Sequence, residues 1–188
     1  MQQQPEKKPS VVLVYTGEGK GKTSAAVGLL GRSLGAGWKV AFIQFIKAWT
    51  VSEHNFFDAI APAYVDKFTF YKGGRGFFNA GDKSAKGVSD EEHLSAARET
   101  FNFAMNLASS GDYDLIICDE INNAVHDKLL SVDDLQDLIE KRASKTSLCL
   151  TGRNFPTELL PKVDIATEMR KIKHHYDDGF LASKGIDF

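Results

Sequence analysis

The sequence has few of the features that mark secreted, membrane-spanning or nucleic-acid-coating proteins. Its two cysteines, Cys118 and Cys149, each lie inside an apolar run, so buried reduced thiols of a cytoplasmic protein are expected rather than a disulfide. No apolar run approaches the roughly 18 residues of a membrane span, and residues 1–10 lack the apolar stretch of a secretory signal. Acidic residues outnumber basic ones by 25 to 23. This balance excludes the strongly basic surface of a non-specific nucleic-acid binder, so neither a nucleic acid nor a membrane is expected as a partner.

The composition that remains is that of one globular domain. Hydrophobic residues make up 43% of the chain and charged residues 26%. The length of 188 residues fits one domain at roughly 150 residues per domain. Residues 1–10 are polar and show no periodicity, so we expect a flexible N-terminal tail followed by a single domain over residues 11–188.

Short apolar segments alternate along this domain with longer amphipathic ones. The pattern predicts strands at about 11–15, 40–45, 65–71, 114–119, 146–151 and 165–169. It predicts helices at about 23–34, 53–60, 89–109 and 131–142, the last opened by a capping box of Ser131 and Asp134. A glycine-rich loop is expected between Gly73 and Gly87. Strands that alternate with helices indicate an α/β fold with a mainly parallel sheet.

The strongest motif is TGEGKGKTS at residues 16–24, which follows the first strand and opens the first helix. In this context the backbone amides of residues 19–22 and the helix N-terminus can converge on phosphate oxygens. Lys22 is expected to bridge the terminal phosphates, and the Thr23 hydroxyl to ligate Mg²⁺. One departure is visible: Thr16 stands where such loops usually begin with glycine, and Gly17 follows one residue late. The expected nucleotide-binding residues here are Gly17, Glu18, Gly19, Lys20, Gly21, Lys22, Thr23 and Ser24.

A pair of acids completes the pattern expected of a nucleotide site. Asp119 and Glu120 end the apolar run at 115–118, which predicts a buried strand. Asp119 is expected to hold Mg²⁺ through water. Glu120 has two interpretations from the residues alone: it activates a water for hydrolysis, or it joins the metal shell.

Further segments follow in an order that resembles a known family. They are IQFIK at 43–47, GFF at 76–78, CDEIN at 118–122, LTGR at 150–153, ATEMR at 166–170 and KGIDF at 184–188. Together with the phosphate loop they resemble the P-loop-type ATP:corrinoid adenosyltransferases, over about residues 11–188. The resemblance implies a single-domain, three-layer P-loop NTPase-like (RecA-like) fold. It also implies transfer of the 5′-deoxyadenosyl group of ATP to the cobalt of a Co(I) corrinoid, with release of triphosphate, in adenosylcobalamin biosynthesis or salvage.

The resemblance assigns roles to further residues. Glu120 is placed in the shell of Mg²⁺ or Mn²⁺. Phe77 and Phe78 match the aromatic segment that displaces the lower cobalt ligand; Asn79 stands where relatives carry Trp, and Phe78 is its expected substitute. The alternative is that both phenylalanines only anchor the loop. Arg153 and Arg32 are expected at the nucleotide, and Lys47 at the corrinoid periphery. A reduced flavoprotein electron donor, a homodimer and a cytoplasmic location are implied as well.

Two other functions stay open from the sequence. One is a small-molecule kinase or ATPase on the same phosphate loop, which the single arginine of the loop at 73–87, Arg75, disfavours. The other is a non-catalytic ATP-gated corrinoid carrier. The histidines are expected to be surface groups: His54, His93 and His126 lie singly among polar residues, and the pair at 174–175 reads as a solvated turn.

Overall fold

Short apolar, β-branched segments form one parallel sheet in the computed structural model, which describes residues 8–78 and 87–188. In this described part the sheet has six strands in the order β3-β2-β4-β5-β1-β6, and every pairing is parallel. The strands are β1 (Val12–Thr16), β2 (Val40–Gln44), β3 (Phe68–Lys72), β4 (Leu115–Asp119), β5 (Ser147–Thr151) and β6 (Ile165–Glu168). The predicted α/β fold with a mainly parallel sheet is confirmed. Most of the predicted N-terminal tail, residues 1–7, lies outside the described residues.

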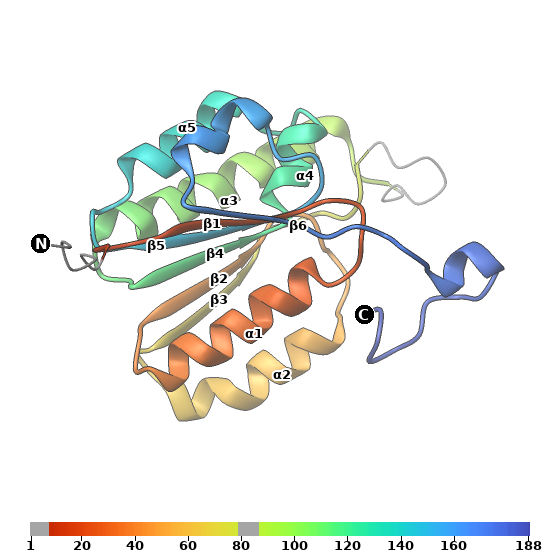
Figure 1. Cartoon of the computed structure of the whole chain (residues 1–188), viewed down its shortest axis with the longest axis horizontal. Coiled ribbons are helices and arrows are strands. Elements are labelled where there is room, and N and C mark those ends of the chain that lie inside the picture. Colours follow the sequence, from red (N-terminus) through yellow and green to blue (C-terminus); the bar gives the residue numbers. More distant parts are fainter. Residues whose placement is uncertain (1–7, 79–86) are drawn as a thin grey trace, which may run out of the picture.

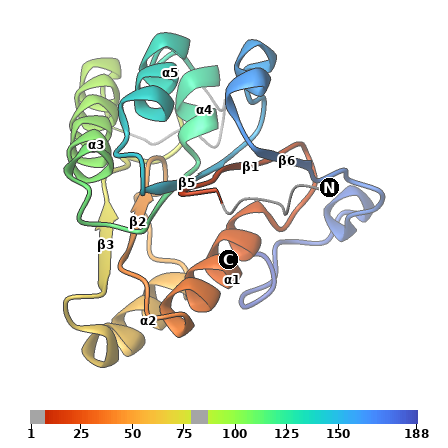
Figure 2. The same ribbon diagram turned by 60° about the vertical axis from the view of Figure 1, so that its left-hand side comes forward.

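Helices cover both faces of the sheet and so make three layers (Figures 1 and 2). On one face lie α1 (Lys22–Gly35) and α2 (Ser52–Ile60); on the other lie α3 (Asp90–Ser110), α4 (Ile121–His126) and α5 (Val132–Lys141). Short 3₁₀ turns occupy Ala61–Tyr64, Thr157–Lys162 and His175–Asp178. In β4, Leu115 and Ile117 pack toward the α1 side, whereas Ile116 and Cys118 pack toward the α3 side. Both faces of the strand are apolar because both are buried.

Serine capping boxes mark the starts of α3 and α5. Ser131 accepts a hydrogen bond from the amide of Asp134 at 3.0 Å, which confirms the predicted capping box, and Ser89 and Glu92 form a second one. The short helix α4 was not predicted, because six residues carry too little periodicity to be recognised. Cys118 and Cys149 are free and buried, as expected. Within residues 8–78 and 87–188, no helix has the length and apolar character needed to cross a bilayer.

Two of the histidine predictions were wrong. His54 and His93 are each only 5% exposed. Both lie on helices, where neighbours in sequence point to different faces, so polar neighbours do not make a residue a surface residue. His126 is exposed, as expected.

The parallel strands deliver their carboxyl ends to one edge of the sheet. The phosphate loop follows β1, Lys47 follows β2, Glu120 follows β4 and Gly152 follows β5. The register places Gln44 beside Asp119 across β2 and β4, and Tyr15 beside Thr151 across β1 and β5. In open α/β sheets this edge is where ligands bind.

Candidate active site

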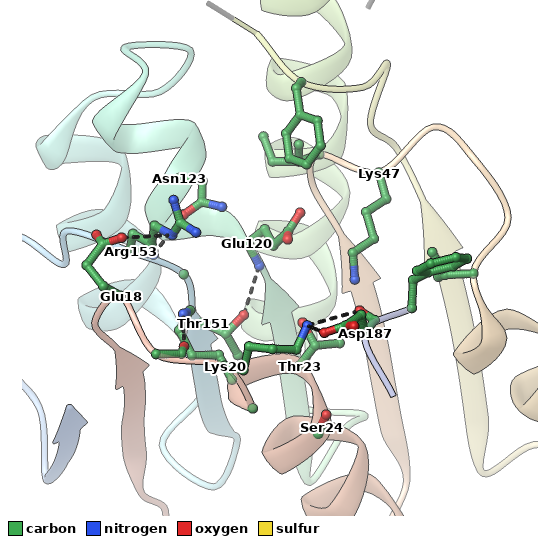
Figure 3. Close-up of a pocket in the computed structure, with 18 of the residues that line it drawn as sticks. Glu18, Lys20, Thr23, Ser24, Lys47, Glu120, Asn123, Thr151, Arg153 and Asp187 are labelled. Atoms are coloured by element: carbon green, nitrogen blue, oxygen red, sulfur yellow. Dashed lines mark hydrogen bonds and ion pairs between the residues drawn. The ribbon is translucent and has the colours of Figure 1, made fainter. Parts of the chain in front are cut away.

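A cavity of about 600 Å³ opens at the carboxyl edge of the sheet. Figure 3 shows side chains from several segments of the chain pointing into it. The lining residues are 18–24, Ile46, Lys47, Trp49, Val51, Phe77, Phe78, Glu120, Asn123, His126, Asp127, 151–154 and 186–188. The cavity therefore brings together three parts that the sequence predicts for the site: the phosphate loop, the acid Glu120 and the aromatic pair Phe77 and Phe78.

The glycines of the phosphate loop are required by close contacts and by backbone conformation. Gly17 and Gly21 have φ of 97° and 106°, where side chains are strained. A Cβ on Gly19 would lie 2.7 Å from the carbonyl oxygen of Met169, and one on Gly17 would lie 2.5 Å from it. The Gly19 amide donates to that same carbonyl at 2.6 Å. This amide therefore fastens the loop to the residue that follows β6. Whether Gly19 contacts phosphate stays a prediction.

The free N–H groups at the start of α1 face no intrahelical acceptor. The helix begins at Lys22, so the amides of Lys22, Thr23 and Ser24 lack a carbonyl four residues back within the helix. These donors and the positive end of the helix dipole lie at the cavity and can bind an anion.

The Lys22 ammonium is folded over the loop. Its Nζ donates to the carbonyl oxygens of Gly17 at 2.7 Å and Gly19 at 2.8 Å. Burial lowers the pKa of Lys22, and the nearby charge of Arg153 lowers it further. A phosphate chain in the cavity would give this half-buried cation an anionic partner in direct contact.

Asp119 is buried and surrounded by hydrogen-bond donors. Its Oδ1 accepts from the hydroxyl of Thr23 at 3.0 Å and from that of Thr151 at 2.7 Å. Its Oδ2 accepts from Nε2 of Gln44 at 3.2 Å. Thr151 in turn accepts from the amide of Glu120 at 2.9 Å, so the strand end is tied together (Figure 3).

Glu120 is a buried acid with an unsatisfied oxygen. Its backbone is left-handed, with φ of 63°, at the tight turn from β4 into α4. Burial raises the pKa of Glu120 to about 7, and the neighbouring Asp119 carboxylate contributes. Among the described residues its Oε2 has no hydrogen-bond partner. Burial of an unpaired polar atom costs free energy, so this Oε2 is a candidate to bind a ligand.

These residues fit a Mg²⁺ ion that is shared with phosphates. Mg²⁺ is usually held by one or two carboxylates together with water and substrate phosphate oxygens. Thr23, Asp119 and the free Oε2 of Glu120 supply oxygen donors of that kind. In the part of the chain that the structure describes, no three His, Cys, Asp or Glu side chains gather as a metal site by themselves. The cation would therefore need the nucleotide to complete its shell.

Lys47 points into the site rather than outward. Its Nζ lies 2.8 Å from Oε1 of Glu53 and 3.7 Å from Oδ2 of Asp119. Burial alone would lower the pKa of Lys47, but Asp119, Glu120 and Glu53 outweigh it and raise that pKa. Lys47 thus lines the cavity between two acids and neutralises part of their charge. Its expected contact with the corrinoid stays a prediction.

An aromatic wall faces the phosphate loop across the cavity. The ring of Phe77 lies 4.9 Å from that of Trp49, and Phe78 lies 5.2 Å from His93, measured between ring centroids. Just before this wall, Gly74 packs so closely against the Ile46 backbone that a Cβ would clash with its carbonyl group. Trp49 was missed in the sequence, although an aromatic residue just after a strand end is a usable signal. Asn79 lies outside the described residues.

The two expected arginines have different positions. Arg153 lines the cavity; its amide donates to Oδ1 of Asn123 at 2.7 Å, and its side chain pairs with Glu18 at 3.4 Å. Arg32 is exposed in the last turn of α1, ten positions beyond Lys22. That spacing corresponds to about 15 Å along the helix. The structure does not bring Arg32 to the cavity.

The segment at 183–188 forms a wall that sequence reasoning did not assign to the site. Asp187 pairs with Lys20 at 2.6 Å, and Ile186 and Phe188 line the cavity (Figure 3). The hydrogen bond from Lys20 holds the pKa of Asp187 low, at about 2. In the sequence, the KGIDF segment at 184–188 is part of the family pattern but carries no assigned role.

Comparisons with known proteins agree with this geometry. Residues 8–188 match the family model described as ATP:corrinoid adenosyltransferase BtuR/CobO/CobP. The corrinoid adenosyltransferase of Pseudomonas aeruginosa is 31% identical over 95% of this chain and 83% of that protein. The corrinoid adenosyltransferase of Escherichia coli K12 is 30% identical over 98% and 89%. Among solved structures, the flagellar accessory protein FlaH of Methanocaldococcus jannaschii has a TM-score of 0.53 at 13% identity, over 86% of this chain and 71% of that one. At that identity the likeness concerns the fold alone, and it agrees with the expected P-loop NTPase-like architecture.

Proposed function

Because the chain belongs to the ATP:corrinoid adenosyltransferase family, we propose that its phosphate loop holds the triphosphate of ATP while C5′ faces the cobalt of a corrinoid. The activity of the chain is transfer of the 5′-deoxyadenosyl group of ATP to a Co(I) corrinoid. The electron pair of Co(I) attacks C5′, a Co–C bond forms, and the C5′–O5′ bond breaks. Triphosphate leaves with the electrons of that bond.

The observation that carries the proposal is a single cavity with an anion-binding floor and an aromatic wall. Residues 18–24 form the floor, and Trp49, Phe77 and Phe78 form the wall. Adenosyl transfer needs a triphosphate and a large apolar ring system to be held side by side. A small-molecule kinase needs instead a polar acceptor and cations around the transferred phosphorus. The aromatic wall favours the first arrangement.

Lys22 and the first amides of α1 are the groups that stabilise the leaving triphosphate. Negative charge builds on the oxygen that departs from C5′ as the bond breaks. Prearranged donors such as the Lys22 ammonium and the amides of Thr23 and Ser24 favour that charge more than they favour the ground state. Arg153 and Glu18 lie at the rim, where they can contact the nucleotide.

Thr23, Asp119 and Glu120 would hold the divalent cation. When bound, Mg²⁺ or Mn²⁺ neutralises charge on the phosphates. Glu120 has no hydrolytic role in this arrangement; its Oε2, which has no hydrogen-bond partner among the described residues, would join the metal shell. Lys47 balances the remaining charge of the acid pair.

Phe77 and Phe78 are proposed to pack against the face of the corrinoid that loses its lower ligand. Co(I) forms more readily once the axial base is removed, and apolar side chains exclude water from that face. Trp49 packs against Phe77 with the two rings tilted by 49°, and it is 40% exposed, so it extends the same surface.

An electron donor, a homodimer and a cytoplasmic location are part of the proposal. Cys118 and Cys149 are buried, and burial raises the pKa of both thiols. Neither thiol lines the cavity, so the cysteines supply no electron there. We propose an external donor for the electron that makes Co(I), and a reduced flavoprotein is the donor that the family resemblance implies. Buried reduced thiols also support a cytoplasmic location. Apolar side chains of Phe180 and Leu181 are 65% and 84% exposed, which supports a homodimer.

Product analysis tests the proposal. The chain is incubated with ATP, Mg²⁺, a corrinoid and a strong reductant, and the products are separated. We expect an adenosylated corrinoid and triphosphate in equal amounts. ADP and phosphate formed without corrinoid would indicate a kinase or ATPase. Tight binding of ATP and corrinoid without turnover would indicate a carrier.

A further inference from the structure

A buried chain of hydrogen bonds runs from the first turn of α2 to the carboxylate of Asp119. Nε2 of His54 lies 2.6 Å from Oε1 of Gln44, and Nε2 of Gln44 donates to Oδ2 of Asp119 at 3.2 Å. At the other end, the backbone amide of Val51 donates to Nδ1 of His54 at 3.4 Å. Gln44 and Asp119 are fully buried, and His54 is 5% exposed.

The hydrogen bond from the Val51 amide to His54 fixes the direction of the other two hydrogen bonds in this series. A backbone N–H can only donate, so Nδ1 of His54 accepts and its proton resides on Nε2. Nε2–H therefore donates to Oε1 of Gln44. The amide nitrogen of Gln44 is then turned to Asp119. A reversed Gln44 amide would place its oxygen against a carboxylate oxygen and its nitrogen against the Nε2–H, which is unfavourable at both ends.

A second contact from the same turn supports Asp119. Glu53, the neighbour of His54, holds the Lys47 ammonium at 2.8 Å, and that ammonium lies 3.7 Å from the same Oδ2. The first turn of α2 thus reaches one oxygen of Asp119 by two routes. The other oxygen, Oδ1, is held by Thr23 and Thr151.

We propose that His54 and Gln44 are positioning residues, which hold the Asp119 carboxylate in the orientation that the cation of the nucleotide site requires. This inference rests on the proposed function, because it assumes the metal at Thr23, Asp119 and Glu120. Neither residue touches substrate; His54 acts through Gln44, and Gln44 through Asp119. Outer groups that orient a metal ligand typically change metal affinity by about 10- to 100-fold when they are lost.

Two substitutions at His54 separate a positioning role from a packing role. Asn can replace the Nδ1 contact but is too short to reach Gln44, whereas the amide of Gln extends to the place of Nε2. His54→Asn should therefore leave the Gln44 amide unfixed, and His54→Gln should hold it. Gln44→Glu is a second test, because it keeps the shape but sets an acceptor against Asp119. Thermal melts of all three variants report the fold.

The measurement is the affinity for ATP by calorimetry, with Mg²⁺ and with EDTA, in the absence of corrinoid. We expect His54→Asn and Gln44→Glu to weaken ATP binding about 10- to 100-fold in Mg²⁺ and to leave binding in EDTA unchanged, while His54→Gln stays within about threefold of the wild type. Raised Mg²⁺ should restore kcat in His54→Asn. Wild-type ATP affinity in His54→Asn and Gln44→Glu would overturn the inference. So would an equal loss of ATP affinity in Mg²⁺ and in EDTA. If Mg²⁺ has no effect on ATP binding by the wild type, the metal site itself is wrong, and the inference falls with it.

Discussion

The ammonium of Lys20 lies 2.6 Å from the carboxylate of Asp187, across 167 positions of the chain. Asp187 also accepts from the Ser183 amide at 2.7 Å and lies 3.2 Å from Nε2 of His175. Its side chain is only 4% exposed. The segment at 183–188 is therefore fastened to the phosphate loop and closes one side of the cavity.

Asp187→Asn should loosen this segment without unfolding the protein. The amide keeps the shape but removes the charge that pairs with Lys20. Because Lys20 is half exposed, solvent screens the pair, and the melting temperature should change little. We expect faster hydrogen exchange over residues 183–188 and a raised KM for ATP. Asp177→Asn is the matched control, since Asp177 pairs with Lys171 and neither residue lines the cavity. Equal effects of the two substitutions would show that the loop contact has no special role.

Lys22→Ala should remove activity and keep the fold. The ammonium contacts two loop carbonyls, and no other lysine is held in this way against the floor of the phosphate site within the described residues. Loss of one prearranged charge at the leaving group should lower kcat/KM by at least about 100-fold. Lys67→Ala is the control, because Lys67 also docks on a carbonyl, that of Gly37, away from the cavity. Near-normal kcat/KM in Lys22→Ala would refute the assignment of the phosphate loop.

Glu120→Gln should stabilise the metal-free protein above neutral pH while it weakens Mg²⁺-dependent ATP binding. The native protein holds the Glu120 proton more tightly than the unfolded chain, because its pKa rises from 4.5 to about 7. Stability therefore falls as pH rises between these two values and stays lower above them. The loss amounts to at most about 3 kcal/mol. Melts in EDTA at pH 5 and pH 8 check this: the variant should gain on the wild type only at the higher pH. The same difference at both pH values would exclude the buried acid as the cause.

The sequence predicts those parts of the site whose residues follow one another directly along the chain. A strand, a glycine turn, Lys22-Thr23 and a helix follow each other directly, and Asp119 ends a clear apolar run, so local pattern is sufficient for both. Local pattern does not reveal the roles of His54 and Asp187, because these depend on contacts with Gln44 and with Lys20. Arg32 shows the opposite case: its match to a family pattern suggested the nucleotide, but helix geometry carries it about 15 Å away.

Phe77→Ala should impair reaction of a Co(II) corrinoid with a mild reductant more than reaction of preformed Co(I). Removal of the ring opens the wall next to Trp49 and readmits water or the axial base. Only the route through Co(II) depends on removal of that ligand. Rates in the two assays are compared with those of Phe56→Ala, since Phe56 is 43% exposed and does not line the cavity. Equal losses in both assays would leave Phe77 with a packing role alone.

The position of the attacked atom is the central claim, and an isotope decides it. ATP labelled with ¹⁸O in the oxygen that bridges C5′ and the α-phosphorus is turned over by the wild type with Mg²⁺ and a Co(I) corrinoid, and the phosphate products are weighed by mass spectrometry. Attack at C5′ leaves the label in intact triphosphate, which is the result we expect. Label that stays on the ribose, or release of unlabelled phosphate, would mean attack at phosphorus and would contradict the account.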